Sequence, residues 1–173
     1  MRIKNSILIQ LSFICLLNAP MAISQESSES ALIDQQVWQP FIESYSTFDH
    51  QTFNGIHSDQ LIRINSKELR DAEAYKAQNT NWFKRAKKEG YKQSIQFNFE
   101  KRIVTADMAF ETGYYKIVIT KPDGKMSDYF ARFHVMLKKE NSRWKIVQDW
   151  DSSTINGEKV TQEDFSKASG KVD

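Results

Sequence analysis

The segment RFHVMLKKENSRWKIVQDWD, near the C-terminal end of the chain, holds the residues best suited to acid, base or ligand chemistry. It reads as two runs of alternating residues on either side of a polar break at 141–142, a pattern typical of a β-hairpin. Pairing the two arms symmetrically about that break sets His134 opposite Asp149. The next pair on the same face is Arg132 with Asp151, so one face carries two opposite-charge pairs.

This charged face has two interpretations. In the first it is a solvated or dimer-facing surface, where each ion pair contributes less than about 1 kcal/mol. In the second, a β-bulge near Gln148 turns Asp149 toward the interior, where His134 or Asp149 could act as an acid, a base or a ligand anchor. The first is favoured, because paired charges on strands are usually structural. The other face is nearly all apolar and predicts core positions at Phe133, Val135, Leu137, Trp144, Ile146 and Trp150.

The residues before the hairpin predict helices. Apolar residues recur at helical spacing, and Pro40 lies either in the first turn of a helix or at a kink in a longer one. Asn65 or Ser66 could cap the clearest helix at its N-terminus, and Gly90 could end it. The expected elements are a helix over 33–48, a short helix over 49–57, a strand over 60–65 and a long helix over 66–89.

From Ser94 onward the apolar period becomes two, which predicts strands over 94–105, 106–120, 128–139 and 143–153. Between the second and third, TKPDGK is a turn, because Pro122 presets φ and Gly124 tolerates a positive φ. Helices followed by an antiparallel meander indicate an α+β fold in which helices cover one face of a curved sheet. A half-closed sheet of this kind forms a cone with a pocket.

Aromatic residues from several of these elements could form the walls of that pocket. Arg132 and Asp149 are the polar candidates. The expected pocket residues are Trp38, Tyr45, Trp82, Tyr115, Arg132 and Asp149.

The first 24 residues predict a secretory signal peptide. Arg2 and Lys4 precede an apolar run over 7–17, and Ala-Ile-Ser ends at residue 24. The run is too short to span a bilayer comfortably, and an uncleaved anchor is the alternative. We therefore expect an exported protein, periplasmic or secreted, that is not inserted in the membrane after cleavage.

Cleavage would leave residues 25–173 as a single domain without Cys15, the only cysteine, so no disulfide could stabilise it. The formal net charge of +2 would fall to zero, because 22 basic residues then face 22 acidic ones. A neutral domain without a basic stripe is a poor candidate for binding nucleic acid. No glycine-rich phosphate loop occurs, and His50, His57 and His134 lack metal-ligand spacing, so neither a metal nor a cofactor is expected.

The chain from Trp38 onward resembles the NTF2-like superfamily, specifically the exported bacterial domains of the SnoaL-like or DUF4440 type. The segments that carry the resemblance are WQPF, HSDQLIRI, AFETGYY and FARFHVMLKKENSRWKIVQDWDSS, and together they extend over nearly the whole predicted mature chain. The resemblance implies a cone of about three helices packed on a strongly bent antiparallel sheet, often assembled as a homodimer. The superfamily includes ketosteroid isomerases, polyketide cyclases, dehydratases and domains of unknown chemistry, so the fold alone does not imply a function.

The comparison with ketosteroid isomerase can be made residue by residue. The tyrosine that donates a proton would fall at Phe41, the general-base aspartate at Asn65 and the protonated aspartate at Ala131. None of the three can perform that role, and although Tyr45 could replace the donor, the base would still be missing. Steroid isomerase chemistry through these positions is therefore excluded.

Three functions follow from the sequence. We expect an exported domain that binds a small, largely apolar molecule in the cone pocket. The first alternative is an enzyme of the cyclase, dehydratase or isomerase type that uses His134 and Asp149. The second is a homodimeric assembly or protein-interaction module.

Overall fold

The structure is a computed structural model that describes residues 28–168 and 170–171. The signal peptide expected over 1–24, the domain start expected at Gln25 and the lone Cys15 lie outside the described residues. Within the described ranges, no helix is both long and apolar enough to cross a membrane.

The N-terminal helix changes its hydrogen-bonding pattern just before Pro40. Residues 28–33 are α-helical, η1 (Asp34–Trp38) is a π-helical turn, and α2 (Gln39–Thr47) continues from it. The backbone N–H of Gln39 donates to the carbonyl of Asp34, five residues back. Pro40 thus lies in the first turn of α2, inside a longer helix that is widened where proline would meet the preceding turn. Asp49 then caps the short α3 (His50–Gly55), accepting from the N–H groups of Gln51 and Thr52.

The long helix begins later than the sequence predicted. α4 (Ala72–Glu89) starts after Asp71, whose side chain accepts from the N–H of Ala74 at 2.9 Å. Asn65 does accept from backbone N–H groups two and three residues ahead, but this contact closes a turn instead of capping a helix. The chain reverses there, so that β2 (Leu69–Asp71) pairs antiparallel with β1 (His57–Asn65). Gly90, at φ 79°, ends the helix as predicted.

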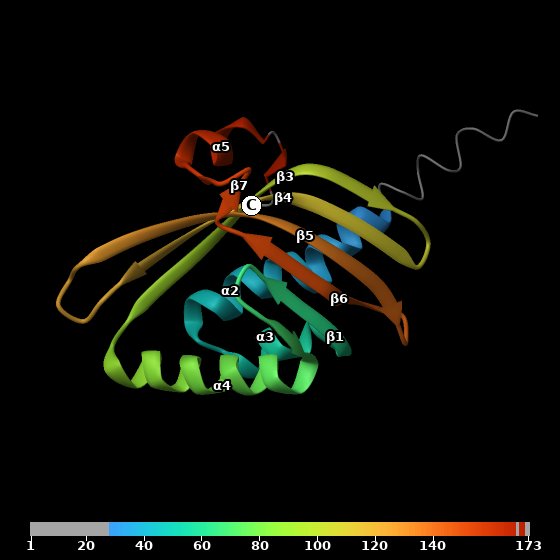
Figure 1. The fold of residues 1–173 in the computed structure, drawn as a ribbon. Helices are drawn as coiled ribbons and strands as arrows, with labels where there is room; N and C mark the ends of the chain where they lie inside the picture. Colours follow the sequence, from blue (N-terminus) through green and yellow to red (C-terminus); the bar gives the residue numbers. More distant parts are fainter. Residues whose placement is uncertain (1–27, 169, 172–173) are drawn as a thin grey trace, which may run out of the picture.

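The four long strands form the predicted antiparallel meander, and Figure 1 shows how they arch over the helices. They are β3 (Lys92–Val104), β4 (Met108–Thr120), β5 (Met126–Glu140) and β6 (Arg143–Ser152). The strand order is β2-β1-β6-β5-β4-β3-β9, with β9 at Gly170–Lys171. β1 runs parallel to β6, so the sheet contains one parallel pair where an all-antiparallel sheet was expected. β7 (Thr154–Ile155) and β8 (Glu158–Lys159) form a small separate hairpin, and α5 (Gln162–Lys167) follows it.

The register of the β5–β6 hairpin departs from the prediction part-way along the strands. Asn141 and Ser142 both have positive φ, which suits a two-residue hairpin turn, and the pairs nearest the turn are those predicted. Val147 then forms a β-bulge, because Leu137 pairs with Ile146 but its neighbour Met136 pairs with Gln148, which leaves Val147 without a pairing partner on β5. The extra residue moves every later side chain of β6 to the other face.

Two predicted cross-strand pairs are therefore wrong. His134 lies opposite Trp150 instead of Asp149, and Arg132 lies opposite Ser152 instead of Asp151. Asp149 lies opposite Val135, a buried residue of the concave face. The interpretation that required a bulge near Gln148 matches this register, and the surface pairing of His134 with Asp149 does not.

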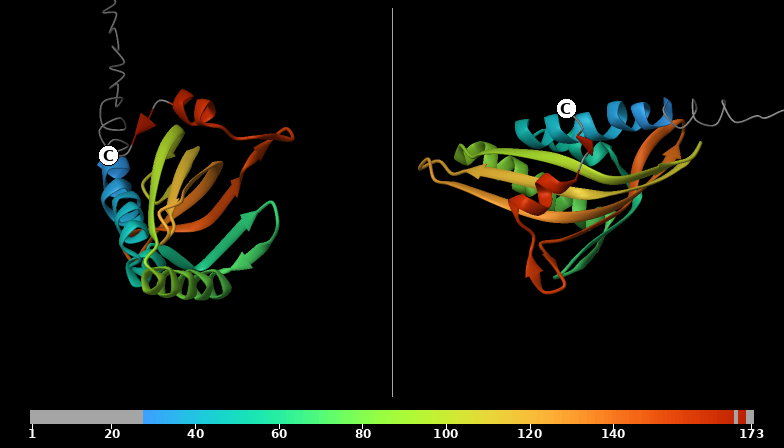
Figure 2. Two further views of the ribbon diagram at one scale, coloured as in Figure 1. Left: turned by 90° about the vertical axis from the view of Figure 1, so that its left-hand side faces the viewer. Right: turned by 90° about the horizontal axis from the view of Figure 1, so that it is seen from above.

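The sheet bends strongly around its core, as the two views in Figure 2 show, with the N-terminal helix along one side and α4 along another. β3 carries a bulge between Phe99 and Lys101, and Gly113 of β4 pairs with Phe99. A Cβ atom on Gly113 would lie 2.2 Å from the carbonyl oxygen of Asn98, so only glycine permits this approach. The result is the expected α+β cone of the NTF2-like type, whose core includes the fully buried Trp38, Phe133 and Trp144.

Candidate functional site

A cavity of about 640 Å³ lies between α4 and the concave face of the sheet. Its volume is within the range of small-molecule sites, and aromatic residues are the largest group in its walls. α4 contributes Tyr75 and Trp82 to the wall of the cavity, and the N-terminal helix contributes Trp38. Strands contribute other lining residues, among them Tyr115 and Phe133. The aromatic lining residues include Trp38, Phe41, Tyr45, Phe97, Tyr115 and Phe133.

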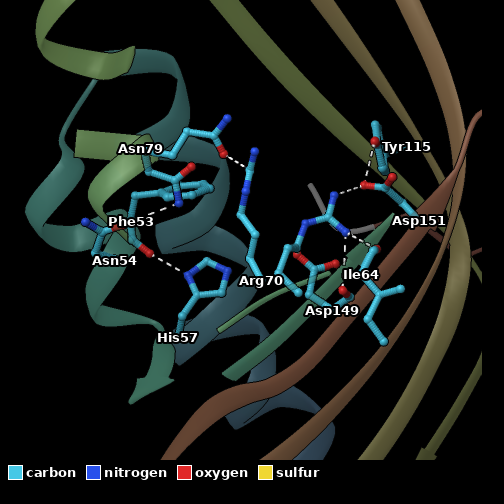
Figure 3. A network of polar contacts seen from close by, with 11 residues as sticks. Phe53, Asn54, His57, Ile64, Arg70, Asn79, Tyr115, Asp149 and Asp151 are labelled. Atoms are coloured by element: carbon cyan, nitrogen blue, oxygen red, sulfur yellow. Dashed lines mark hydrogen bonds and ion pairs between the residues drawn. The ribbon is translucent and has the colours of Figure 1, made fainter. Parts of the chain in front are cut away.

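One polar region of the cavity wall consists of Arg63, Asp149, Asp151 and Tyr115, which we call the Arg63 cluster. A second polar region is formed by residues of α4, namely Gln78, Asn79, Asn81 and Arg85. Nε of Arg63 lies 3.4 Å from Oδ2 of Asp149, and Nη2 forms an ion pair with Oδ2 of Asp151. The hydroxyl of Tyr115 donates to the same Asp151 oxygen at 3.0 Å. Figure 3 shows Tyr115, Asp149 and Asp151 close together at the sheet.

Strand pairing explains why these side chains meet. Parallel pairing of β1 with β6 sets Arg63 beside Asp149 and Asn65 beside Asp151. Asp149 and Asp151 are two residues apart on one strand, so both point to the same face, and the bulge at Val147 makes that the concave face. A change of one residue in the register would turn both carboxylates away from the cavity.

Burial dominates the electrostatics of the Arg63 cluster. It raises the pKa of Asp149 and of Asp151, although the charge of Arg63 opposes the shift in both. Burial likewise raises the pKa of Tyr115 well above its usual value. Burial alone would lower the pKa of Arg63, but the charges of Asp149, Tyr75 and Asp151 raise it. The guanidinium is thus held charged, while each carboxylate is costly to ionise.

Five of the six residues expected to line the pocket do border the cavity: Trp38, Tyr45, Trp82, Tyr115 and Asp149. Arg132 does not. It lies on the convex face, where Nη2 is 2.9 Å from Oε2 of Glu100 and the guanidinium is 6.0 Å from the ring of Tyr114. The bulge explains this placement, because it separates Arg132 from the aspartates that it was predicted to accompany.

His134 also lies on the convex face. Its ring is 4.7 Å from that of Trp150 and 6.0 Å from that of Phe110, and Nε2 is buried with no hydrogen-bond partner among the described residues. Burial lowers its pKa. His134 and Asp149 therefore lie on opposite faces of the sheet and do not share a site.

The positions compared with ketosteroid isomerase are placed as follows. Phe41 borders the cavity, Asn65 closes the β1–β2 turn, and Ala131 is fully buried. Tyr45 also borders the cavity, and burial raises its pKa. No carboxylate occupies any of the three positions, so the acidic groups of this cavity come from β6 instead.

Sequence reasoning missed Arg63, the cation at the centre of the polar cluster, and assigned Asp151 to a different partner. A signal for Arg63 was present, because it is two residues after Leu61 on the same strand and so shares its face. Leu61 is 1% exposed, so that face is the interior. A basic residue in such a position requires buried partners.

His57 is a further buried polar residue, next to the cavity and 2% exposed. Nδ1 lies 2.8 Å from the carbonyl oxygen of Phe53, and Nε2 has no partner among the described residues. Burial lowers its pKa to about 3, so the ring is neutral near neutral pH. Across residues 28–168 and 170–171, no group of three or more His, Cys, Asp or Glu side chains could hold a metal ion.

A second charged group, partly buried, joins the N-terminal helix to the sheet, and we call it the Arg102 cluster. It consists of Arg102, Asp34, Glu111 and Trp38. Nε of Arg102 donates to Oε1 of Glu111 at 2.7 Å, and its Nη2 and Nη1 donate to the two oxygens of Asp34 at 2.6 and 3.2 Å. Trp38 Nε1 donates to Oε2 of Glu111 at 2.6 Å. The first and last residues of the π-helical turn, Asp34 and Trp38, both belong to this cluster.

The sequence model of the SnoaL-like domain family matches residues 35–156, which include every strand of the meander and every residue of the Arg63 cluster. No curated protein matches the chain. Identity to solved structures is low and shows a shared fold only.

Three solved structures illustrate that fold. An NTF2-like protein with a cystatin-like fold from Novosphingobium aromaticivorans superposes with a TM-score of 0.62 at 9% identity, covering 89% of this chain and 97% of that one. An NTF2-like protein of unknown function from Shewanella oneidensis gives 0.59 at 16% identity, covering 72% and 98%. A nuclear transport factor 2-like superfamily protein from Salmonella enterica gives 0.55 at 14% identity, covering 76% and 95%.

Proposed function

The chain belongs to the SnoaL-like domain family, and from that premise we propose that it binds a small, largely apolar molecule in the cavity between α4 and the sheet. The observation that carries the proposal is a cavity of about 640 Å³ in whose walls aromatic residues are the largest group, with the Arg63 cluster as its buried charged region. Each Å² of apolar ligand surface removed from water there contributes about 25 cal/mol, and the polar groups fix the orientation of the ligand. We propose that this binding takes place outside the cytoplasm, on the basis of the predicted signal peptide.

N-phenyl-1-naphthylamine, a neutral dye that becomes fluorescent in apolar surroundings, tests this function. We expect saturable binding of one dye per chain, with energy transfer from Trp38 and Trp82, which border the cavity. Ile117→Trp should fill the cavity and weaken binding about tenfold or more, because Ile117 is part of its wall. The matched control is Ile103→Trp, at a position 44% exposed and outside the cavity lining.

Binding that does not saturate, or that is equally strong in the Ile117→Trp and Ile103→Trp variants, would contradict the proposed function. Circular dichroism of both variants shows whether each one has folded.

An enzyme of the cyclase or dehydratase type is the alternative use of the same cavity. Asp149 is the candidate acid or base, since its pKa is raised by burial. His134 has no part in it, because that ring is on the convex face. Binding of a ligand is the first requirement of both functions.

A role in assembly has separate support from the convex face. Cross-strand pairing places Ile62, Gln148, Met136, Phe110 and Ile103 in one row across five strands. Ile62, Phe110 and Ile103 are 47%, 36% and 44% exposed. Nε2 of His134, which is buried and has no partner among the described residues, lies beside the row. A second copy of the chain, related by a twofold axis, would cover this row and supply a polar partner for His134.

We expect sedimentation velocity to give a dimer at micromolar concentration and Phe110→Glu to give a monomer, since a charge in an apolar contact is costly. Glu100→Gln is the control on the same face, away from the row. A monomeric wild-type protein would remove the assembly proposal and leave the cavity untouched.

A further inference from the structure

The charges of the Arg63 cluster do not balance. It contains one guanidinium and the carboxyl groups of Asp149 and Asp151, so with both carboxyls ionised one negative charge remains within the cluster. The other charged residue of the cavity wall, Arg85 of α4, is exposed and lies over the ring of Trp82 at 5.1 Å, outside the cluster. An unbalanced charge in surroundings of low polarity is unfavourable. A ligand of opposite charge would remove that imbalance.

Arg63 has little capacity left for an anionic ligand. Nη1 donates to the carbonyl oxygens of Ile64 and Asp149 at 2.5 and 3.2 Å, while Nε and Nη2 face the two carboxylates. The guanidinium therefore already contacts four protein oxygens. A carboxylate or phosphate ligand would meet two aspartates and a cation that is already engaged.

The two aspartates differ in how well the protein satisfies them. Asp151 accepts from Arg63 and from the Tyr115 hydroxyl. Asp149 has only the 3.4 Å contact from Nε of Arg63, and no other partner of its carboxyl group occurs among the described residues. Its side chain is 13% exposed and borders the cavity. No hydrogen bond to Oδ1 of either aspartate occurs among the described residues, but Asp149 is the less satisfied of the two, so its Oδ1 is the better acceptor for a ligand.

The walls around this acceptor suit a cation. Aromatic rings attract positive charge through the negative faces of their π-systems. Tyr75 already has the Arg63 guanidinium 5.8 Å from its ring centre, and it borders the cavity together with Tyr115. A carboxylate among aromatic rings is an arrangement that recognises ammonium groups.

We propose that the ligand of this cavity is an apolar amine, whose protonated amino group binds Oδ1 of Asp149 and whose hydrocarbon body packs against the aromatic walls. This inference rests on the proposed function and names the class of its ligand. The rival arrangement has Asp149 protonated and donating a hydrogen bond to a carbonyl group of a neutral ligand. The two make opposite predictions for ligand charge and for pH.

The test is a matched series of three probes with one naphthalene body, titrated into the purified protein by calorimetry: 2-(2-naphthyl)ethylamine, 2-acetylnaphthalene and 2-naphthylacetic acid. At about pH 7.5 these are a cation, a neutral ketone and an anion. We expect the amine to bind about tenfold or more tightly than the ketone, and the acid to bind most weakly.

The pH dependence separates the two arrangements further. The groups that face Asp149 are Arg63 of β1, Asp151 of β6 and Tyr75 of α4. Burial raises the pKa of Asp149, so amine affinity should be complete above that raised pKa and should fall as the pH decreases through it. Ketone affinity would instead rise with acidification if the protonated carboxyl group were the donor.

The variant Asp149→Asn should lower amine affinity about tenfold and leave ketone affinity nearly unchanged. Asp128→Asn, at an exposed position of β5, is the matched control for loss of one negative charge. If Asp149→Asn does not fold, the pH series on the wild-type protein still decides between the arrangements.

Ketone binding as tight as amine binding, or tightest binding of the acid, overturns the amine proposal and leaves the proposed function standing. The same holds if none of the three probes binds while N-phenyl-1-naphthylamine does. If the neutral dye also fails to bind, the proposed function fails together with the amine proposal.

Discussion

The Arg102 cluster and the Arg63 cluster are built from the same kinds of groups. Each has one arginine, two carboxyl groups and one aromatic side chain that donates a hydrogen bond. In the Arg102 cluster all four carboxyl oxygens have a partner, with Asp34 and Glu111 each held at both oxygens. In the Arg63 cluster both recorded partners of Asp151 use Oδ2, and Asp149 is held by one long contact.

The difference lies in what surrounds each cluster. The Arg102 cluster lies between η1 and two strands, and its charged residues do not line the cavity. Its carboxylate Glu111 is fully buried, although Arg102 and Asp34 are partly exposed. The Arg63 cluster borders a cavity of about 640 Å³, which leaves carboxyl oxygens without protein partners. A buried ion pair that is fully hydrogen-bonded fixes a structure, whereas one that is partly satisfied leaves capacity for a ligand. The same residue types therefore form a structural contact in the Arg102 cluster and a candidate binding site in the Arg63 cluster.

The largest expected effect comes from removing the arginine of the Arg102 cluster. Arg102→Met should destabilise the protein by about 3 kcal/mol, because it leaves the fully buried Glu111 without its cation. Arg63→Met should cost less, about 1–2 kcal/mol, because water in the cavity can solvate the remaining carboxyl groups. Urea unfolding of both variants measures the difference. An equal loss of unfolding free energy in both variants, or a larger loss for Arg63→Met, would contradict the distinction between a structural cluster and a binding site.

A smaller effect of opposite sign is expected for Asp149→Asn, which removes the poorly satisfied carboxyl group and keeps its shape. Stability should be unchanged or higher by up to about 1 kcal/mol at neutral pH. Burial raises the pKa of Asp149, so the folded wild-type protein holds this proton more tightly than the unfolded chain does. The contribution of Asp149 to wild-type stability is then complete below the pKa that this carboxyl group has in the unfolded chain. That contribution is lost as the pH rises through its pKa in the folded protein.

The gap in unfolding free energy between Asp149→Asn and the wild type should therefore widen as the pH increases from about 4 toward neutrality. Denaturant unfolding at a series of pH values measures it. A variant that is less stable than the wild type at neutral pH would show that Asp149 is a satisfied structural group like Glu111.

Much of the fold was predictable because its determinants are local. Period-two alternation located the four long strands, and the breaks at 141–142 and at Gly124 are turns as expected. The start of α4 was wrong because an asparagine side chain that accepts from nearby N–H groups serves equally well in a turn or a helix cap. Local chemistry therefore predicted where the chain changes direction more reliably than which element follows.

The candidate site was predictable in part. The aromatic residues Trp38, Tyr45 and Trp82 could be named because cones of this kind require aromatic walls, and they do border the cavity. Arg132 was assigned to the cavity because a regular register pairs it with Asp151, and the bulge at Val147 separates the two residues. Arg63 is on another strand and was missed although it shares a strand face with Leu61.

The amino-acid sequence by itself determined the α+β architecture, the antiparallel meander and its turns, because hydrophobic period and turn chemistry act over a few neighbouring residues. Only the tertiary structure decided which charged groups meet. Arg63 contacts the carbonyl oxygen of Asp149 across 86 residues of chain, through the parallel pairing of β1 with β6, the last strand of the meander. The bulge at Val147 then directs both aspartates into the cavity, because burying the apolar face of the hairpin sets the register on either side of it.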